Sequence, residues 1–252
     1  MSVRALSFGA VAEAYERFRP GYPGELADLV ADYAGRPIRT ALEIGAGTGK
    51  ATRLFAARGI AVTATEPDAG MLTELHRLAL PNVTPMQSGF EELSSPGTFD
   101  LVYAAAALHW TRPEGRWPRI AGMLVPGGVF ACFGGPLQLS DPALEEDVRT
   151  AQSPYLEGSD IPSPDGTPPD AEMQWPGTEL LQSDLFTDVQ QHVLERPLTM
   201  TARDYVSHLS TISAYIQLPA GEQDEVYRRI ELALPPVVEL TADIWVHLAR
   251  RR

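Results

Sequence analysis

Three glycines at alternate positions carry the strongest chemical signal in the chain. The segment Glu43-Ile44-Gly45-Ala46-Gly47-Thr48-Gly49-Lys50 follows a short apolar run and precedes a helix-like pattern. Glycine lets the backbone turn tightly and approach a ligand that a Cβ would keep away. The spacing differs from the Gly-x-Gly-x-x-Gly of dinucleotide-binding loops, and Ala51 departs from the Gly-Lys-Ser/Thr of phosphate-binding loops. The turn therefore predicts a site for a flat or anionic ligand; the alternative is a tight strand-to-helix junction that binds nothing.

Two further polar residues follow predicted strands. Glu66 comes 17 positions after Gly49, about where a doubly wound fold brings a carboxylate to a ribose. Its two oxygens can accept from both vicinal hydroxyls, which favours a nucleoside ligand; the alternative is a solvated acidic residue at a helix start. His109 follows the apolar run 99–103, and an imidazole can take a proton near neutral pH. The alternative for His109 is that it only shapes a pocket beside Trp110.

Alternating strands and helices position these residues. Short apolar runs predict strands at 40–44, 61–65, 83–87, 99–103 and 129–133, and longer periodic segments predict helices at 50–58, 69–80 and 114–124. This order is typical of an α/β fold with a doubly wound, mostly parallel sheet. Pro85 predicts that 83–87 lies at a sheet edge. Two more helices are expected at 10–18 and 24–33, before the first strand.

The second half of the chain has a weaker pattern. Six prolines between 154 and 177 predict an irregular cap or loop, with a disordered insert as the alternative. Beyond it we expect a strand at 189–195, helices at 202–213 and 222–234, and a last strand at 237–247. The expected division is lid helices at 1–37, a ligand-binding core at 38–139, a Pro-rich cap at 140–185, and a part at 186–252 that completes the sheet and the acceptor pocket.

Composition excludes several classes of function. The 252 residues contain 20 Lys and Arg against 33 Asp and Glu, a formal charge of −13. Because a protein that binds phosphate backbones needs a basic face, nucleic acid is not an expected partner. The single cysteine, Cys132, excludes an internal disulfide and favours a reducing, cytoplasmic location. No apolar run reaches the roughly 20 residues of a membrane-spanning helix, so no membrane partner is expected either.

Five motifs follow one another between about residue 8 and residue 135. They are Leu42–Gly49, Glu66-Pro67-Asp68 with Met71, Phe99-Asp100-Leu101-Val102, Ala107-Leu108-His109-Trp110, and Leu124-Val125-Pro126-Gly127-Gly128. Together they resemble the class I methyltransferases that use S-adenosylmethionine. The fourth motif and the leading segment Tyr15–Pro23 are most similar to the type 11, trans-aconitate methyltransferase-like subgroup that acts on small molecules. The resemblance implies a seven-stranded, mostly parallel sheet with helices on both faces and a small cap after strand five.

The resemblance also implies which residues bind the cofactor, S-adenosylmethionine, and its product S-adenosylhomocysteine. The glycine turn would hold the methionine part, Glu66 the ribose, and Pro67 and Met71 the adenine. Gly89 stands where many relatives have an adenine-binding Asp, which leaves that role to the main chain around Phe90 or to Glu91. The full expected set is Tyr15, Arg19, Gly45, Gly47, Thr48, Gly49, Glu66, Pro67, Met71, Phe90, Glu91 and Ala104.

Methyl transfer from a sulfonium needs alignment and exclusion of water more than a nucleophilic residue. His109 is the candidate base, and no metal is expected. The acceptor is expected to be a small molecule, a secondary metabolite or small carboxylic acid, methylated on O, N or C by a monomer or homodimer. Alternatives are a protein that binds S-adenosylmethionine without transfer, or a nicotinamide-dependent enzyme. The residues expected to line the acceptor pocket are Tyr22, Trp110, Trp175, Tyr205, His208 and Tyr215.

Overall fold

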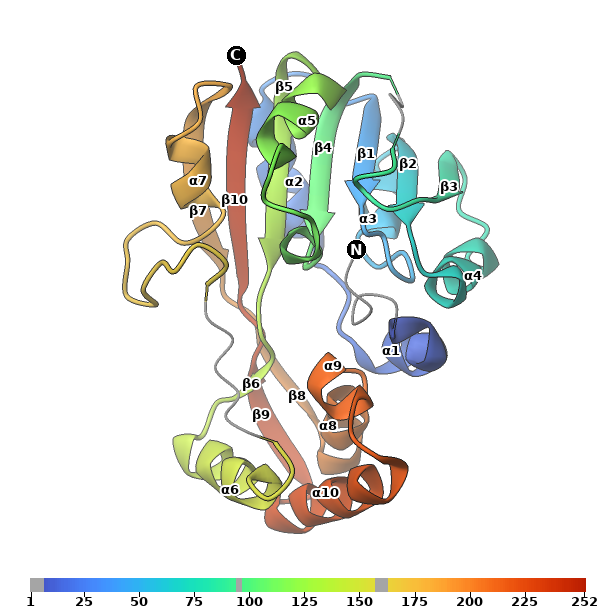
Figure 1. The fold of residues 1–252 in the computed structure, drawn as a ribbon, viewed down its shortest axis with the longest axis vertical. Coiled ribbons are helices and arrows are strands. Elements are labelled where there is room, and N and C mark those ends of the chain that lie inside the picture. The colour runs from blue at the N-terminus through green and yellow to red at the C-terminus, as the bar shows by residue number, and fades with distance from the viewer. Residues whose placement is uncertain (1–6, 94–96, 157–162) are drawn as a thin grey trace.

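Strand β1 (Thr40–Ile44) is the third of the seven strands of the main sheet. The structure is a computed structural model that describes residues 7–93, 97–156 and 163–252. Strands β2 (Ala61–Glu66), β3 (Val83–Gln87), β4 (Phe99–Ala105) and β5 (Leu124–Gly134) run parallel, and β10 (Ile244–Arg251) is antiparallel to β5 and to β7 (Phe186–Leu194). The order is β3-β2-β1-β4-β5-β10-β7 (Figure 1). The predicted α/β sheet is confirmed, and β3, which contains Pro85, lies at its edge.

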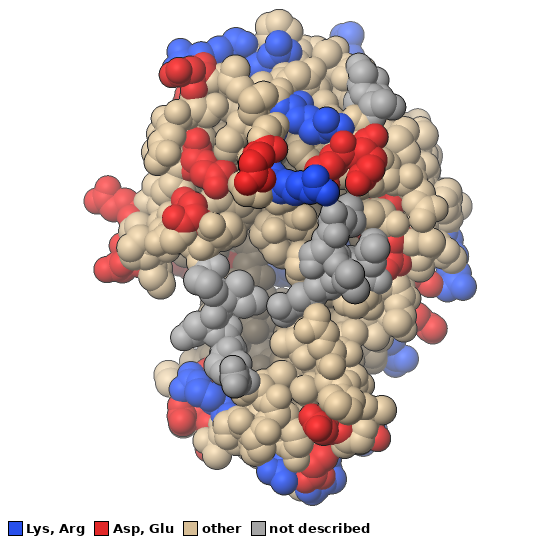
Figure 2. All heavy atoms as spheres, viewed as in Figure 1, with Lys and Arg blue, Asp and Glu red and all other residues tan. Residues whose placement is uncertain are grey.

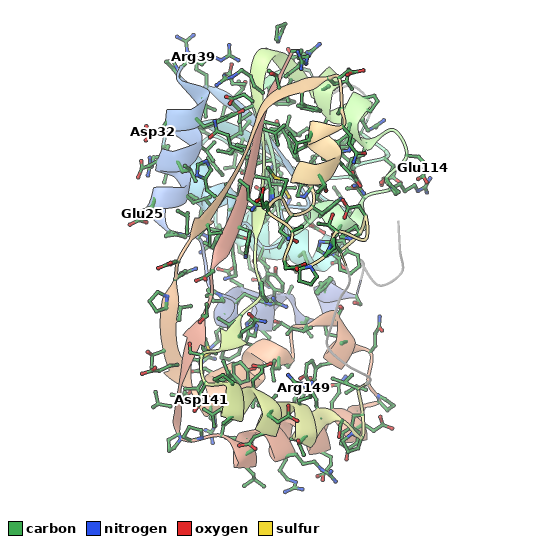
Figure 3. The ribbon with its side chains drawn as sticks, turned by 90° about the vertical axis from the view of Figure 1, so that its left-hand side faces the viewer. Glu25, Asp32, Arg39, Glu114, Asp141 and Arg149 are labelled. Carbon is green, nitrogen blue, oxygen red and sulfur yellow. The ribbon has the colours of Figure 1, made fainter. Side chains whose placement is uncertain are left out.

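Helices cover both faces of this sheet. Because successive side chains of a strand point to opposite faces, Ala41 packs with α2 (Gly24–Ala34) and α3 (Thr52–Ala56), whereas Leu42 packs with α5 (Arg116–Met123) and α7 (Gly177–Leu181). Helix α4 (Ala69–Arg77) adds Leu72 and Leu75 to the first of these clusters. Glu25 and Asp32 project outward from α2 (Figure 3), so this helix buries one face and exposes the other.

A second, smaller lobe lies below the sheet in Figure 1. It contains a three-stranded antiparallel sheet in the order β6 (Gln138–Leu139), β9 (Val237–Thr241), β8 (Pro197–Thr201). Helices α6 (Pro142–Gln152), α8 (Ala202–Leu209), α9 (Ser213–Ile216) and α10 (Ala220–Ala233) pack with it around a buried core that includes Val226, Ile230 and Leu240. Asp141 and Arg149 of the α6 region lie on the outside of this lobe (Figure 3).

The N-terminal segment lies between the two lobes. A short 3-10 turn, η2 (Phe8–Val11), leads into α1 (Ala12–Phe18), and α1 contacts both α4 of the large lobe and α8 of the small lobe (Figure 1). A second such turn, η3 (Leu108–Trp110), follows β4. In the described part of the chain no helix has the length and apolarity needed to cross a bilayer, and no group of His, Cys, Asp and Glu side chains is placed to hold a metal ion.

Several expectations for the second half are wrong. The single strand expected at 237–247 is two strands in different sheets, β9 and β10, because the chain crosses between lobes at Ala242 and Asp243. The helix expected at 202–213 ends at Leu209, and α6, α7, β6 and β8 were not expected. Of the segment 140–185, which was predicted as a cap, only α6 belongs to the small lobe. The elements from β8 to β9 also belong to this lobe, although they lie in the segment 186–252 that was predicted to complete the sheet. Residues 157–162 of the predicted insert lie outside the described residues.

A partly buried ion pair attaches the 163–181 segment to the large lobe. Glu179 accepts hydrogen bonds from Trp117 Nε1 at 2.8 Å, Trp175 Nε1 at 3.0 Å and Arg116 Nη1 at 3.2 Å. The Arg116 side chain is only 2 % exposed, and its guanidinium group lies over the rings of both tryptophans. Trp175, which was expected in the acceptor pocket, therefore serves in this network beside α5.

Replacing Glu179 with alanine should lower the free energy of unfolding by about 2 kcal/mol, because it leaves a buried guanidinium group without its anion. The matched control is Glu146→Ala, which removes an exposed ion pair with Arg149 and should change stability by less than about 0.5 kcal/mol. Urea unfolding of both variants measures the difference. Equal stabilities for the two variants would contradict the structural role of Glu179.

Candidate functional site

The turn after β1 requires glycine at three positions. The φ angles of Gly45, Gly47 and Gly49 are +68°, +56° and +89°, in the left-handed region that side chains disfavour. A Cβ at Gly45 would lie 2.6 Å from Cβ of Ala107, and one at Gly49 would lie 2.5 Å from Leu75 Cδ1. Neither Gly45 nor Gly49 therefore has room for a side chain. The main chain of the turn borders the cavity described below.

Glu43, directly before this turn, is a buried carboxyl group with one oxygen unused. Its Oε2 accepts hydrogen bonds from Thr52 Oγ1 at 2.5 Å and Tyr103 OH at 2.9 Å. Its Oε1 has no hydrogen-bond partner among the described residues. Burial raises the pKa of Glu43 to about 8. Because a buried polar atom without a partner is unfavourable, Oε1 is suited to receive a donor from a ligand.

Glu66 holds the turn from the end of β2. Its carboxylate accepts from the main-chain N–H of Gly47 at 2.8 Å and of Asp68 at 2.9 Å, and burial raises its pKa to about 7. Asp68 in turn caps α4, accepting from the N–H groups of Gly70 and Met71, and also accepts from the N–H of Gly9 in η2. The N-terminal segment is thus hydrogen-bonded beside Glu66, and the ribose-binding role of Glu66 stays a prediction.

Helix α1 connects the glycine turn to the small lobe. Near its C-terminal end, Glu16 accepts a hydrogen bond from Thr48 Oγ1 at 2.7 Å and pairs with Lys50 and Arg53. Just beyond the helix, Arg19 donates from Nε to Thr211 Oγ1 at 2.8 Å and from Nη2 to the Thr211 carbonyl at 3.1 Å. The helix therefore closes over the turn and holds the lobes together at the same time.

A cavity opens between the lobes, beside this helix. The space between its lining residues that holds no protein atom is about 760 Å³, open solvent included. The face in Figure 2 is indented between the upper and lower lobes, and acidic and basic side chains are interspersed on it. The predicted site residues that line the cavity are Tyr15, Arg19, Tyr22, Gly45, Gly47, Thr48 and His208.

The other predicted residues lie elsewhere. Tyr205 and Tyr215 are in the core of the small lobe, and Ala104 and Phe90 are in the core of the large lobe. Met71 is buried on α4, and Glu91 accepts from the N–H of Arg112 at 2.7 Å. Those outside the cavity lining are Gly49, Glu66, Pro67, Met71, Phe90, Glu91, Ala104, His109, Trp110, Trp175, Tyr205 and Tyr215.

His109 is an exposed residue of η3, at the carboxyl end of β4. Its ring contacts Trp110 with the centroids 4.6 Å apart, and Trp110 meets the ring of Phe8 from η2 at 6.0 Å. The side chain lies outside the cavity lining, and its role as a base stays a prediction.

Sequence reasoning missed most of the residues that line the cavity from the connections between the lobes. Arg196 is the main one: its main-chain N–H donates to Asp243 Oδ1 at 2.8 Å, and its guanidinium donates to the Gly21 carbonyl at 2.5 Å. Among the missed residues, Glu43, Lys50 and Ala51 could have been predicted, because they flank the glycine turn in the sequence. The lining residues that were not predicted are Pro20, Gly21, Glu43, Ala46, Lys50, Ala51, Ala105, Ala106, Gly135, Pro136, Leu137, Arg196, Ala242, Asp243 and Ile244.

Comparison with known proteins agrees with this geometry. Residues 41–128, which hold the turn, β2 and β4, match the family model of a methyltransferase domain. An uncharacterized methyltransferase of Mycobacterium tuberculosis is 31% identical over 232 residues, 91% of this chain and 86% of the relative. A trans-aconitate 2-methyltransferase of Deinococcus radiodurans is 35% identical over 120 residues, 46% of each chain.

Solved structures share the fold. A protein assigned as a type II methyltransferase from Anaeromyxobacter dehalogenans superposes with a TM-score of 0.65 at 23% identity, covering 92% of this chain and 98% of that one. Phosphoethanolamine N-methyltransferase 2 of Haemonchus contortus, solved with S-adenosylhomocysteine, gives 0.52 at 17% identity, covering 97% of this chain and 57% of that one. The match to the mycobacterial relative extends over most of both chains, and the family model matches the motifs around the glycine turn. The chain therefore belongs to the class I S-adenosylmethionine-dependent methyltransferases.

Proposed function

We propose that this enzyme methylates an O, N or C atom of a small molecule, a secondary metabolite or small carboxylic acid, which enters the cavity between the lobes. One observation carries the proposal. The cavity is lined on one side by the glycine turn and on the other by the connections to the small lobe. A cofactor on the turn and an acceptor below it would therefore share one enclosed space, as an in-line transfer requires.

The residues at the turn suit S-adenosylmethionine. When bound, the cofactor supplies a sulfonium methyl group with a good thioether leaving group. The turn exposes main chain to the methionine part, the unpartnered Oε1 of Glu43 suits its ammonium group, and Arg19 is the lining cation proposed for its carboxylate. Helix α1 contributes by excluding water, because its contacts with Thr48 and Thr211 cover the cavity from the side.

The acceptor side contains a cation from the small-lobe connection. Arg196 lines the cavity, and no carboxylate of the described residues lies within ion-pair distance of its guanidinium group. This favours a small acceptor with an acidic group, in agreement with the name of the trans-aconitate 2-methyltransferase relative. The net charge of −13 and the mixed charges in Figure 2 support a small molecule over nucleic acid.

Calorimetric titration with S-adenosylmethionine, S-adenosylhomocysteine and NADH tests the cofactor site. We expect both sulfur ligands to bind and NADH not to bind. Incubation with methyl-labelled S-adenosylmethionine and a small-molecule extract of the producing organism, followed by mass spectrometry, then identifies the acceptor. Failure of both sulfur ligands to bind would overturn the proposal, as would the absence of any labelled small molecule when the cofactor does bind.

Replacing Glu66 with glutamine should weaken S-adenosylhomocysteine binding about tenfold, the effect of roughly 1.4 kcal/mol. Glutamine keeps one acceptor for the Gly47 or Asp68 N–H but loses the charge-assisted bonds expected from the ribose hydroxyls. Calorimetry gives the affinity, and Glu146→Gln, at an exposed residue outside the cavity lining, is the control. An unchanged affinity in the Glu66 variant would show that the ribose is held by other residues.

A further inference from the structure

Two opposite charges on the cavity lining are not yet matched. Among the charged lining residues, Lys50 pairs with a glutamate of α1, and Arg19 and Glu43 are proposed for the carboxylate and the ammonium group of the cofactor. The others are Arg196, between β7 and β8, and Asp243, between β9 and β10. One cation and one anion therefore remain on the side of the cavity that the proposed function assigns to the acceptor.

The guanidinium group of Arg196 has no anionic partner. Its Nη1 donates to the Gly21 carbonyl at 2.5 Å, and it takes part in none of the ion pairs of the described residues. Burial lowers the pKa of this half-buried side chain, but an arginine keeps its charge in proteins. Because a partly desolvated cation without an anion is unfavourable, its remaining donors are suited to a ligand carboxylate.

The carboxylate of Asp243 likewise has no cationic partner among the described residues. Its Oδ1 accepts from the main-chain N–H of Arg196 at 2.8 Å. Its Oδ2 makes no hydrogen bond with the described residues, and it is not one of their buried polar atoms without a partner, so part of its surface is accessible. Asp243 and both of its neighbours, Ala242 and Ile244, line the cavity. Oδ2 is therefore available to a donor from a ligand.

The fold keeps these two charges from neutralising each other. The main chain of Arg196 holds the Asp243 carboxylate, whereas the side chain of Arg196 extends to Gly21 on the segment after α1. The two charged groups thus lie on adjacent connections between the lobes without forming an ion pair. A ligand with a single charge would match only one of them, and a ligand that carries both an anion and a cation would match both.

We propose that Arg196 and Asp243 bind a small amino acid as the methyl acceptor, with its carboxylate on the Arg196 guanidinium group and its amine on Oδ2 of Asp243. The inference deepens the proposed function and rests on it, because it assigns this side of the cavity to the acceptor. It narrows the acidic acceptor to one that also carries an amine. The two residues act by binding and orienting this molecule.

Two variants remove one charge each. Asp243→Asn keeps an oxygen that can accept from the Arg196 N–H but has no negative charge for the amine. Arg196→Gln keeps the main-chain N–H for Asp243 but has no guanidinium group for the carboxylate. Two exposed residues outside the cavity lining provide controls of the same kind, Asp224→Asn in α10 and Arg203→Gln in α8.

The experiment uses sets of three probes with a shared carbon skeleton on the full chain saturated with S-adenosylhomocysteine. Each set holds an amino acid, the same acid without the amine, and the same amine without the acid. The sets are alanine with propanoate and ethylamine, leucine with isocaproate and isoamylamine, and phenylalanine with hydrocinnamate and phenethylamine. Binding is followed by calorimetry and by the ¹⁵N resonance of Arg196 Nε, assigned from its loss in Arg196→Gln.

We expect the amino acid of at least one set to bind about tenfold or more tightly than its acid and its amine, and to shift Arg196 Nε. In Asp243→Asn this amino acid should bind within about twofold of its acid, and in Arg196→Gln within about twofold of its amine. Both controls should keep the preference, and the S-adenosylhomocysteine affinity should stay within about twofold in all four variants.

The proposal is overturned if no amino acid binds more tightly than its acid, or if either cavity variant keeps the full preference. It is also overturned if these variants lose about tenfold or more in S-adenosylhomocysteine affinity, because Arg196 and Asp243 then face the cofactor. Failure of S-adenosylhomocysteine to bind the unaltered protein would contradict the proposed function instead, and the probe sets without it still test the two residues.

Discussion

Replacement of Gly45 with alanine is expected to weaken S-adenosylhomocysteine binding at least about 100-fold, a change of roughly 2.8 kcal/mol. Two effects act together. The φ angle of +68° costs an L-residue roughly 1–2 kcal/mol, and the added Cβ would lie 2.6 Å from Cβ of Ala107. The turn must then move away from η3, and its main chain no longer borders the cavity in the same way. Calorimetric titration measures the loss.

The matched control is Gly122→Ala. Gly122 is in α5, and a Cβ there meets nothing within 4 Å. The variant should bind S-adenosylhomocysteine within about twofold of the unaltered protein and gain up to about 1 kcal/mol of stability from helix propensity. If Gly45→Ala bound as tightly as Gly122→Ala, the glycine turn would not be part of the cofactor site.

The second prediction concerns the pH dependence of stability and the buried carboxyl group of Glu43. Its pKa is raised by burial to about 8 in the folded protein, from an ordinary value near 4.5 in the unfolded chain. The folded state therefore binds the proton more tightly, so the contribution of Glu43 to stability is fully present below about pH 4.5. It is lost as the pH rises toward 8, by up to about 1.4 kcal/mol per pH unit.

Glu43→Gln removes this titration and keeps an oxygen that can accept from Thr52 and Tyr103. Unfolding free energies measured in urea from pH 4.5 to pH 9 should fall less steeply in the variant, so that its stability relative to the unaltered protein increases with pH. Glu66, whose pKa is raised to about 7, titrates in both proteins, and its charge adds to the raised pKa of Glu43 in the unaltered protein.

The exposed residue Glu146 gives the control, since Glu146→Gln should follow the unaltered protein across this range. Parallel curves for Glu43→Gln and the unaltered protein would show that Glu43 does not carry a raised pKa. S-adenosylhomocysteine binding should also weaken in Glu43→Gln, because the carboxyl group of Glu43 can ionise when the cofactor ammonium group binds, whereas glutamine cannot.

The first half of the fold could be predicted because its signals are local. The apolar runs at 40–44, 61–65 and 99–103 became β1, β2 and β4 within two residues of their expected ends. Buried parallel strands are continuous apolar segments, and helices with breakers separate them. The glycine turn could be placed for the same reason, because a backbone with positive φ angles favours glycine, and three glycines stand there.

The small lobe could not be predicted in this way. The 237–247 segment has the apolar pattern of one strand, yet Val238 and Leu240 pack in the small lobe while Val246 and Leu248 pack in the large one. Burial in either core requires the same residue types, so composition does not tell which sheet a strand joins. Tyr205 and Tyr215 were expected at the acceptor pocket for the same reason and instead belong to the core of the small lobe.

The sequence alone determined the family, the parallel sheet and the place of the glycine turn, for which we propose cofactor binding, because each of these depends on neighbouring residues. Only the tertiary structure decided which side chains meet in the cavity. Arg196 and Asp243 come from two different crossings between the lobes, and His208 comes from a helix that meets α1 across the space between them. Such contacts depend on how distant segments pack, and no local pattern of residue types records them.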